Sequence, residues 1–346
     1  MQDHPRNDST RRERLWPYGV LLAGLNLILY APAMDNGFSL DDFNWLARAE
    51  FSSSWWRFVF DVEPGQILNP VPRALFLLIH SVSGGEPFPI HMAILTLHVV
   101  TVILLLVFVE RVAGNRQVAL LAAVLFSIET SHHEAVFWVA AFFYPLSGVL
   151  CLGALIAAGS YQSRGGRGPA LLTALCATAG LLTKASCFAV LPVMLLLPGS
   201  RPRRWRLAGL LASLMVAAIA MNVAVGAGSS YLISEGHYRL GFHVIGNLLH
   251  YLGWMVVPFD QALGWLGLSV PWTTVWRVLG VGVLGALVAI VLRAGAWARP
   301  FVGLLLAPLV LVLPFAFEPA SRYTFLPALG ASALGAGLLV TVAGGA

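Results

Sequence analysis

The stretch Ile90–Glu110, IHMAILTLHVVTVILLLVFVE, decides the fold class of this chain. It contains no Asp, Lys or Arg, and its only Glu is its last residue. A helix needs about 20 mostly apolar residues to cross a hydrocarbon core of roughly 30 Å. The stretch has that length and lacks the alternating pattern of a membrane β-strand, so we predict a membrane-spanning helix.

Composition extends this prediction to the whole chain. Of the 346 residues, 58% are hydrophobic and 11% are charged, and mean hydropathy is +0.79, whereas a soluble domain has about 25% charged residues. We predict an all-α polytopic membrane protein with about ten or eleven spans of roughly 20 residues each. The net charge of +5 fits arginine-rich cytoplasmic loops and does not indicate nucleic-acid binding. The cysteines lack metal-ligand spacing, so we interpret them as packing residues.

The predicted organisation is a polar cytoplasmic tail over residues 1–14 and a single membrane domain over 15–346. The first span is Leu15–Met34. Residues 35–89 then form a first external loop, and a loop of this length is usually functional. Its aromatic residues and its short apolar segment Ala74–His80 are typical of helices that lie in the membrane interface.

Further apolar runs continue to the C-terminus. In the fourth span, Pro145 and Gly148 predict a kink. The topology of 242–275 stays open. If Phe242–Pro258 spans, the loop after it is internal, yet Val275–Leu292 leads to Arg293 and Arg299, which are also expected to be internal. Both placements hold only if 259–272 also crosses or one segment is re-entrant. The predicted spans that follow Ile90–Glu110 are Val118–Ile128, Phe137–Ser160, Ala170–Leu182, Phe188–Leu197, Leu207–Val225, Val275–Leu292, Phe301–Phe315 and Thr324–Val342.

The first external loop begins with DNGFSLDDFNW, Asp35–Trp45, which holds the adjacent carboxylates Asp41 and Asp42. By itself the pair is more simply a solvated turn that caps the next helix than a catalytic or metal-binding site. On the predicted topology, other charged and histidine residues gather on the same side, and ionisable groups at membrane depth mark functional sites. We therefore favour the site. The other residues of this group are Arg73, Glu129, His132, His133, Glu134, Lys184, Glu235, Glu318 and Arg322.

These residue types suit one kind of chemistry. Carboxylates and imidazoles accept a proton or hold a divalent metal. Arg73, Lys184 and Arg322 suit a phosphate, and preorganised cations stabilise the charge that develops on a phosphate leaving group. The set contains the parts for transfer from a phosphorylated donor to a hydroxyl acceptor.

Each part also has a structural interpretation. Arg73 and Lys184 would equally extend their charged ends to lipid headgroups. His132 and His133 are more simply hydrogen-bonding residues at a helix start than metal ligands. His132 and Glu134 point to the same side only if the backbone there is extended, since side chains two residues apart share a face in a strand and not in a helix.

Six stretches carry a family resemblance: LDDFNW at 40–45, NPVPRALFLLIH at 69–80, HHEAVFWVAAFFYPLSGVL at 132–150, GLLTKASCFAVLPVMLLL at 180–197, YLGWMVVPF at 251–259 and SRYTFLPALG at 321–330. In this order the chain resembles membrane glycosyltransferases of the GT-C superfamily. It is most similar to the protein O-mannosyltransferase-like branch, which includes the transmembrane part of TPR-containing O-mannosyltransferases and bacterial relatives. It departs from the family at Ala185 and Ser321, where Glu is common, and at Phe143–Tyr144, which replace an Arg and a polar residue.

The resemblance implies an inverting transferase that uses a polyprenyl-phosphate-linked sugar and an acceptor protein or glycan. Asp42, or Asp41 beside it, would be the general base. Three cations, Arg73, Lys184 and Arg322, would hold the lipid phosphate. The resemblance leaves metal use open, and it places His132 and Glu134 at the acceptor or at a divalent metal ion.

We expect a bacterial inner-membrane protein whose site faces the periplasm, and the Ala-, Leu-, Gly- and Arg-rich composition fits a GC-rich bacterial genome. The alternative is a transporter or flippase of a lipid-linked glycan, which predicts charges deep within spans and broken helices in corresponding halves. A non-catalytic membrane subunit is the third interpretation.

Overall fold

The computed structural model describes residues 15–62, 67–225, 236–258, 271–293, 295–316 and 319–344. Within these ranges the regular structure is helical, with one isolated antiparallel bridge between Tyr238 and Phe315. The all-α prediction is thus confirmed. Six helical segments are long and apolar enough to cross a membrane, as judged by length and composition: Trp16–Asp35, Pro87–Ala113, Val139–Arg164, Arg201–Ala224, Trp272–Val291 and Ser321–Gly344.

Six is fewer than the ten or eleven spans that we predicted. The predicted spans Val118–Ile128 and Phe301–Phe315 form helices of 13 and 12 residues. At about 1.5 Å per residue, each covers roughly 20 Å, which is less than the hydrocarbon thickness. The higher count stays a prediction, and residues 259–270, on which the topology of 242–275 depends, lie outside the described ranges.

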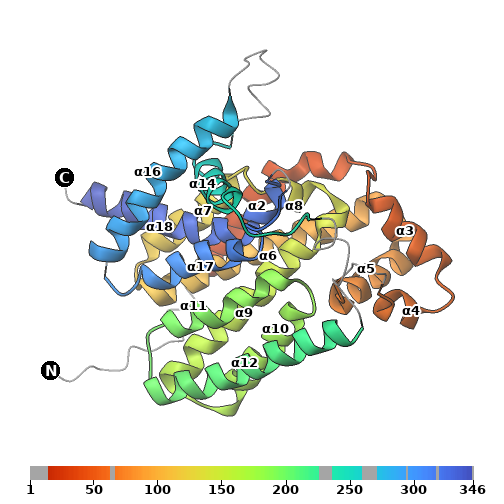
Figure 1. Cartoon of the computed structure of the whole chain (residues 1–346), viewed down its shortest axis with the longest axis horizontal. Helices are drawn as coiled ribbons and strands as arrows, with labels where there is room; N and C mark the ends of the chain where they lie inside the picture. The colour runs from red at the N-terminus through yellow and green to blue at the C-terminus, as the bar shows by residue number, and fades with distance from the viewer. Residues whose placement is uncertain are drawn as a thin grey trace.

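A central group of helices forms the core (Figure 1). Helix α6 (Pro87–Ala113) packs against α7 (Arg116–Ile128) and α9 (Phe143–Arg164), and α18 (Phe325–Gly344) packs against α7 and α17 (Arg299–Val310). Large aromatic side chains fill the space between them and are fully buried: Phe108, Phe126, Phe301 and Phe325. The N-terminal α2 (Trp16–Tyr30), which continues into η1 (Ala31–Asp35), packs on α6 and α7.

Two further groups flank this core (Figure 1). On one side α10 (Arg167–Leu181) packs against α9 and α12 (Arg201–Ala224), and α11 (Val190–Leu196) packs against α17. On the other side α14 (His243–Trp254) packs against α16 (Trp272–Arg293). This second pair comes so close that a Cβ at Gly253 would lie 1.9 Å from the Trp276 carbonyl oxygen. Glycine is therefore required where α14 crosses α16.

The predicted external loop forms three short helices, α3 (Asp42–Phe51), α4 (Trp55–Phe60) and α5 (Pro70–Ser83), which lie together at one end of the molecule (Figure 1). Proline within the first two positions of α5 and a left-handed Gly84 just after it explain its limits. On α4, Trp55 and Trp56 stack with ring centroids 3.7 Å apart and are both more than half exposed. Exposed tryptophans are typical of a membrane interface.

The fourth predicted span breaks before its proline. Helix α8 (Glu134–Phe137) and the 3-10 turn η2 (Val139–Ala141) precede α9, so Pro145 lies in the first turn of α9, where a missing N–H costs no helical hydrogen bond. Gly148 serves packing, because a Cβ there would lie 2.8 Å from Phe325 and 2.9 Å from Thr101. The kink predicted at these two residues is replaced by this earlier break.

Helix α9 separates two chemically different ends. With 22 residues it is about 33 Å long. At its C-terminal end Arg111 donates to Ser160 at 3.0 Å, and Arg203 donates to the Ser163 carbonyl oxygen at 3.0 Å. At its N-terminal end Phe143 lines a cavity together with Asp41 and Lys184. The arginine-rich loops and the acidic pair therefore lie at opposite ends of the bundle.

Candidate functional site

A cavity of about 660 Å³ lies where the loop helices meet the bundle. We call it the Lys184 cavity. Its wall is assembled from segments far apart in the sequence and combines charged with apolar side chains, among them Asp41, Arg73, Phe143, Lys184, Leu311 and Tyr323. Three of the seven predicted site residues, Asp41, Arg73 and Lys184, thus come together in one place.

Lys184 occupies the bend between α10 and the 3-10 helix η3 (Ala185–Ala189), where its backbone is extended. Its Nζ lies 4.0 Å from the ring centroid of Tyr144, 4.8 Å from that of Phe143 and 5.6 Å from that of Tyr323. Rings at such distances attract a cation through their electron-rich faces. No carboxylate of the described residues forms an ion pair with Lys184.

Burial lowers the pKa of Lys184 to about 7, and the positive charge of Arg322 acts in the same direction. The amine is therefore balanced between its charged and neutral forms near neutral pH, so that an anion in the cavity would favour the charged form. Lys184 is also the only lysine among the 21 lysine and arginine residues of the chain.

The two adjacent aspartates have different surroundings. Asp41 is exposed and lines the Lys184 cavity. Asp42 is fully buried, and its two carboxylate oxygens accept hydrogen bonds from the backbone N–H groups of Ser39 at 2.8 Å and Ala140 at 2.6 Å. Burial raises the pKa of Asp42, and these two hydrogen bonds oppose the rise. Asp42 ties α3 to η2, and only Asp41 faces the cavity.

Arg73 is buried at the start of α5. Its guanidinium donates to the backbone carbonyl oxygens of Phe58, at 3.4 Å, and of Asp61. These bonds fix the guanidinium against α4 and the segment after it while it lines the cavity wall. Arg73 and Lys184 therefore line the same cavity, and the role of Arg73 toward a phosphate stays a prediction.

Arg322 and Glu134 pair with each other. Arg322 Nη1 lies 3.0 Å from Glu134 Oε2, and the guanidinium lies over the rings of Trp138 and Tyr323, 5.0 Å and 5.2 Å from their centroids. Neither residue belongs to the cavity wall, whereas Tyr323 does. Arg322 therefore does not line the cavity in which a phosphate is expected, although the next residue, Tyr323, does. Its positive charge lowers the pKa of Lys184.

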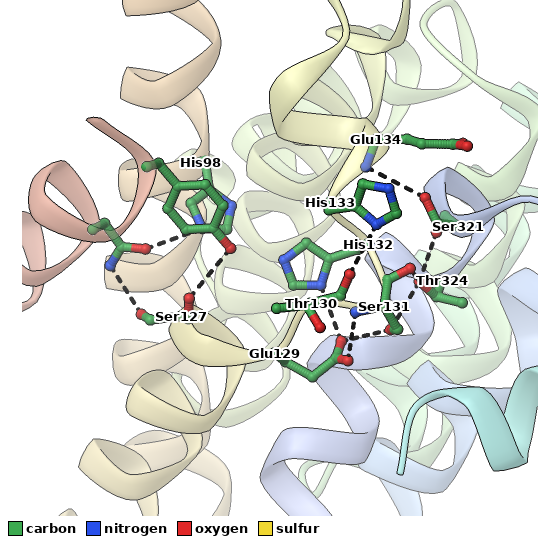
Figure 2. Close-up of polar contacts among 12 residues, drawn as sticks. His98, Ser127, Glu129, Thr130, Ser131, His132, His133, Glu134, Ser321 and Thr324 are labelled. Atoms are coloured by element: carbon green, nitrogen blue, oxygen red, sulfur yellow. Dashed lines mark hydrogen bonds and ion pairs between the residues drawn. The ribbon is translucent and has the colours of Figure 1, made fainter. Parts of the chain in front are cut away.

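His132 is fully buried and points away from Glu134 (Figure 2). Its Nδ1 lies 3.1 Å from Glu129 Oε2, and Glu129 also accepts from the backbone N–H and the hydroxyl of Ser131 at 2.7 Å and 2.6 Å. Thr324 Oγ1 in turn lies 2.8 Å from the Ser131 carbonyl oxygen. Thr324 directly precedes α18, so these bonds connect the block 129–134 to the start of that helix. Within the block, the side chains of His132 and Glu134 do not share a face.

A second set of polar contacts lies deeper, between α2, α6 and α7 (Figure 2). Asn26 donates to Ser127 Oγ at 2.9 Å, and its carbonyl oxygen lies 3.0 Å from His98 Nε2. The rings of His98 and His132 have centroids 5.6 Å apart. We call these two sets together the buried network: Asn26, His98, Ser127, Glu129, Ser131, His132 and Thr324.

The described residues contain no group of three or more His, Cys, Asp or Glu side chains that could hold a metal ion. The expected pair His132 and Glu134 is divided between two different partners, Glu129 and Arg322. The alternative of hydrogen bonding at a helix start applies to His133, whose Nδ1 lies 3.1 Å from the Thr130 carbonyl oxygen. Glu235 and Glu318 lie outside the described residues.

The aromatic surroundings of Lys184 were not predicted from the sequence. Phe143 and Tyr144 are departures from the family pattern, and of the three rings around the ammonium group theirs are the nearest. The available signal was the position of the single lysine in a chain whose other cationic side chains are all arginine.

Comparison with known proteins gives no match: no protein-family model, no curated protein and no solved structure is similar to this chain.

Proposed function

We propose that this chain is a membrane glycosyltransferase of the GT-C type, which transfers a sugar with inversion from a polyprenyl-phosphate donor to a hydroxyl acceptor. One observation carries the proposal. A cation without a carboxylate partner among the described residues, Lys184, and an exposed carboxylate, Asp41, line the same cavity at the end of an apolar helical bundle.

The cavity wall divides into parts that suit the two halves of such a donor. Lys184 and its aromatic surroundings would hold the phosphate, since an ammonium group binds phosphate as a point charge. The apolar residues Leu311, Val312 and Phe315 line the same cavity and would contact the first prenyl units. The rest of the polyprenyl chain would lie in the membrane beside the six long apolar helices.

Asp41 would act as the general base. It would accept the proton of the acceptor hydroxyl while the acceptor oxygen forms a bond to the anomeric carbon from the side opposite the phosphate. The bond between the anomeric carbon and the phosphate oxygen breaks, and its electron pair leaves with the polyprenyl phosphate. Lys184 stabilises the added negative charge, and Asp41 later releases the proton to water.

Asp41 is preferred to Asp42 because both oxygens of Asp42 already accept backbone hydrogen bonds in a buried position. Arg322, held by Glu134, would orient Tyr323 at the cavity wall. No step in this scheme requires a metal ion. In a bacterial inner membrane the cavity would face the periplasm, where an acceptor protein or glycan would reach it.

The test is to incubate the purified chain in lipid nanodiscs with a polyprenyl-phospho-sugar and an excess of hydroxyl acceptors, and to follow the release of polyprenyl phosphate. Release that depends on Asp41 and Lys184 supports the proposal. In sealed vesicles, passage of the intact donor across the bilayer without bond cleavage would instead establish a lipid-glycan transporter. Donor binding without cleavage under all acceptor conditions would establish a non-catalytic subunit.

A further inference from the structure

A second cavity, of about 560 Å³, adjoins the first one within the loop helices. We call it the arginine chamber. Three arginines line it, Arg48, Arg57 and Arg73, and Asp61 is the one acidic side chain among its lining residues. Arg48 and Arg73 also line the Lys184 cavity, as do Asn44 and Phe58. The two spaces therefore share a wall of four residues and form one continuous surface.

Helix α3 connects the carboxylate to the arginines. Asp41, Asn44 and Arg48 are spaced at intervals of three and four residues, which places them on one face of the helix, and all three line the Lys184 cavity. Arg48 follows Asp41 by seven positions, which corresponds to about 10 Å along a helix axis. The surface thus has a carboxylate at one end and guanidinium groups roughly 10 Å further on.

The guanidinium groups of Arg73 and Arg57 are held in place by their neighbours. Arg73 is fixed by backbone carbonyl oxygens of α4 and the segment after it. Arg57 Nη1 donates to Ser53 Oγ at 3.1 Å, and its helix is capped by Ser54, whose hydroxyl accepts from the Arg57 N–H. Planar guanidinium groups held in this way suit bidentate recognition of phosphate or carboxylate.

We infer that the arginine chamber binds an anionic group, a phosphate or a carboxylate, that the acceptor carries about 10 Å from its reacting hydroxyl. This inference rests on the proposed function and specifies its acceptor class. Arg57 and Phe58, which line the chamber, directly follow the exposed Trp55 and Trp56 on α4, and tryptophans of this kind belong to the headgroup layer. The anionic group therefore comes either from a lipid headgroup or from a soluble acidic glycan.

The first experiment measures binding alone. The full chain in nanodiscs of zwitterionic lipid is titrated with glycerol phosphate, and binding is followed by tryptophan fluorescence. We expect Arg48→Gln and Arg57→Gln each to weaken binding at least tenfold. The matched control is Arg201→Gln, which changes an exposed arginine at the opposite end of the bundle, and it should alter binding less than twofold. Equal losses in all three variants, or none in any, would overturn the inference.

Two further arms identify the source of the anion and separate this inference from the proposed function. Phosphatidylglycerol in the nanodisc should compete with glycerol phosphate if the natural source is a headgroup, and a soluble acidic glycan should compete if it is not. Arginine-dependent binding without any cleavage of a polyprenyl-phospho-sugar would leave the chamber standing and reject the transferase. Transfer at equal rates to neutral and anionic acceptors would retain the transferase and reject the chamber.

Discussion

The buried network and the Lys184 cavity use polar side chains in opposite ways. In the buried network each side chain has at least one polar partner, as Asn26 has Ser127 and His98, although one ring nitrogen of His98 and one of His132 have no hydrogen-bond partner. The ammonium group of Lys184 lies against three aromatic rings and forms no ion pair with a carboxylate among the described residues. A polar group buried among helices requires a partner within the protein. A charged group that lacks one at a cavity wall is available to a ligand, so the difference separates structural from functional residues.

The same contrast exists between neighbours in the chain. Asp41 and Asp42 are adjacent, yet Asp42 is bonded to two backbone N–H groups and Asp41 faces the cavity. The pair Arg322 and Glu134 is intermediate between a buried, bonded residue and an exposed one that faces a cavity. Both side chains are about one third exposed, and each has the other as its ionic partner. Each of the following substitutions tests whether a residue is structural or functional, as its contacts indicate.

The largest effect is expected from the two aspartates. Removing a general base typically lowers turnover by about 10²- to 10⁴-fold, so Asp41→Asn should reduce polyprenyl phosphate release by that amount without lowering the thermal unfolding midpoint. Asp42→Asn should instead reduce the free energy of unfolding by about 1–3 kcal/mol, because one amide oxygen cannot replace two carboxylate acceptors. If Asp42→Asn abolished turnover in a protein of unchanged stability, the assignment would be reversed.

Lys184→Met should come next. Loss of a preorganised donor to developing charge costs about 10²- to 10³-fold in turnover, and the apolar methionine fits a site surrounded by rings. Lys184→Arg keeps the charge and should retain more activity. The measurement is polyprenyl phosphate release at saturating donor. Normal turnover in Lys184→Met would show that Lys184 is a structural residue and does not act on the leaving phosphate.

A smaller effect concerns pH. With the pKa of Lys184 near 7, protonated amine falls about tenfold per pH unit above that value, so binding of a short-chain polyprenyl phosphate should weaken as pH rises from 7 to 9. In Lys184→Arg the guanidinium stays charged and binding should be flat. Lys184 is the only lysine, so amine-selective labelling with peptide mapping reports its titration directly. Half-maximal reactivity near pH 10 would contradict the lowered pKa.

Particular residues show how much of this was accessible from sequence. Apolar runs predicted the helical class and the longest spans, because twenty apolar residues have few alternatives to a membrane helix. Topology and resemblance placed Asp42 or Asp41 together with Arg73, Lys184 and Arg322; Asp41, Arg73 and Lys184 line one cavity, whereas Asp42 and Arg322 do not line it. The pairing of Arg322 with Glu134 was not, because side-chain partners 188 residues apart are set by helix packing and leave no local pattern.

The choice between Asp41 and Asp42 illustrates the same limit. Motif position favoured Asp42, but the direction of each side chain depends on where α3 begins and on the backbone of η2, whose Ala140 N–H reaches Asp42. Short helices have ends that sequence signals fix poorly. The sequence could indicate that one of the two carboxylates faces a cavity, and only the packing of α3 against η2 selects which.

The smallest effect should come from Thr324, which joins the start of α18 to the block 129–134. Thr324→Val keeps the shape and removes the hydroxyl, which lies 2.8 Å from the Ser131 carbonyl oxygen and 3.1 Å from its hydroxyl. We expect a loss of about 1 kcal/mol in the free energy of unfolding, measured in detergent, with unchanged donor binding.

The matched control for that change is Thr341→Val, at the other end of α18. Its hydroxyl is bonded only within the helix, to the Gly337 carbonyl oxygen at 2.7 Å, and the residue is exposed, so its removal should cost less than about 0.5 kcal/mol. Both variants delete the same hydroxyl, so their difference reports the bonds that Thr324 forms in its buried position, to Ser131 and to the Ser321 carbonyl oxygen at 2.7 Å. If Thr324→Val weakened donor binding as strongly as Lys184→Met, the buried network would be part of the site, and the separation between the two regions would fail.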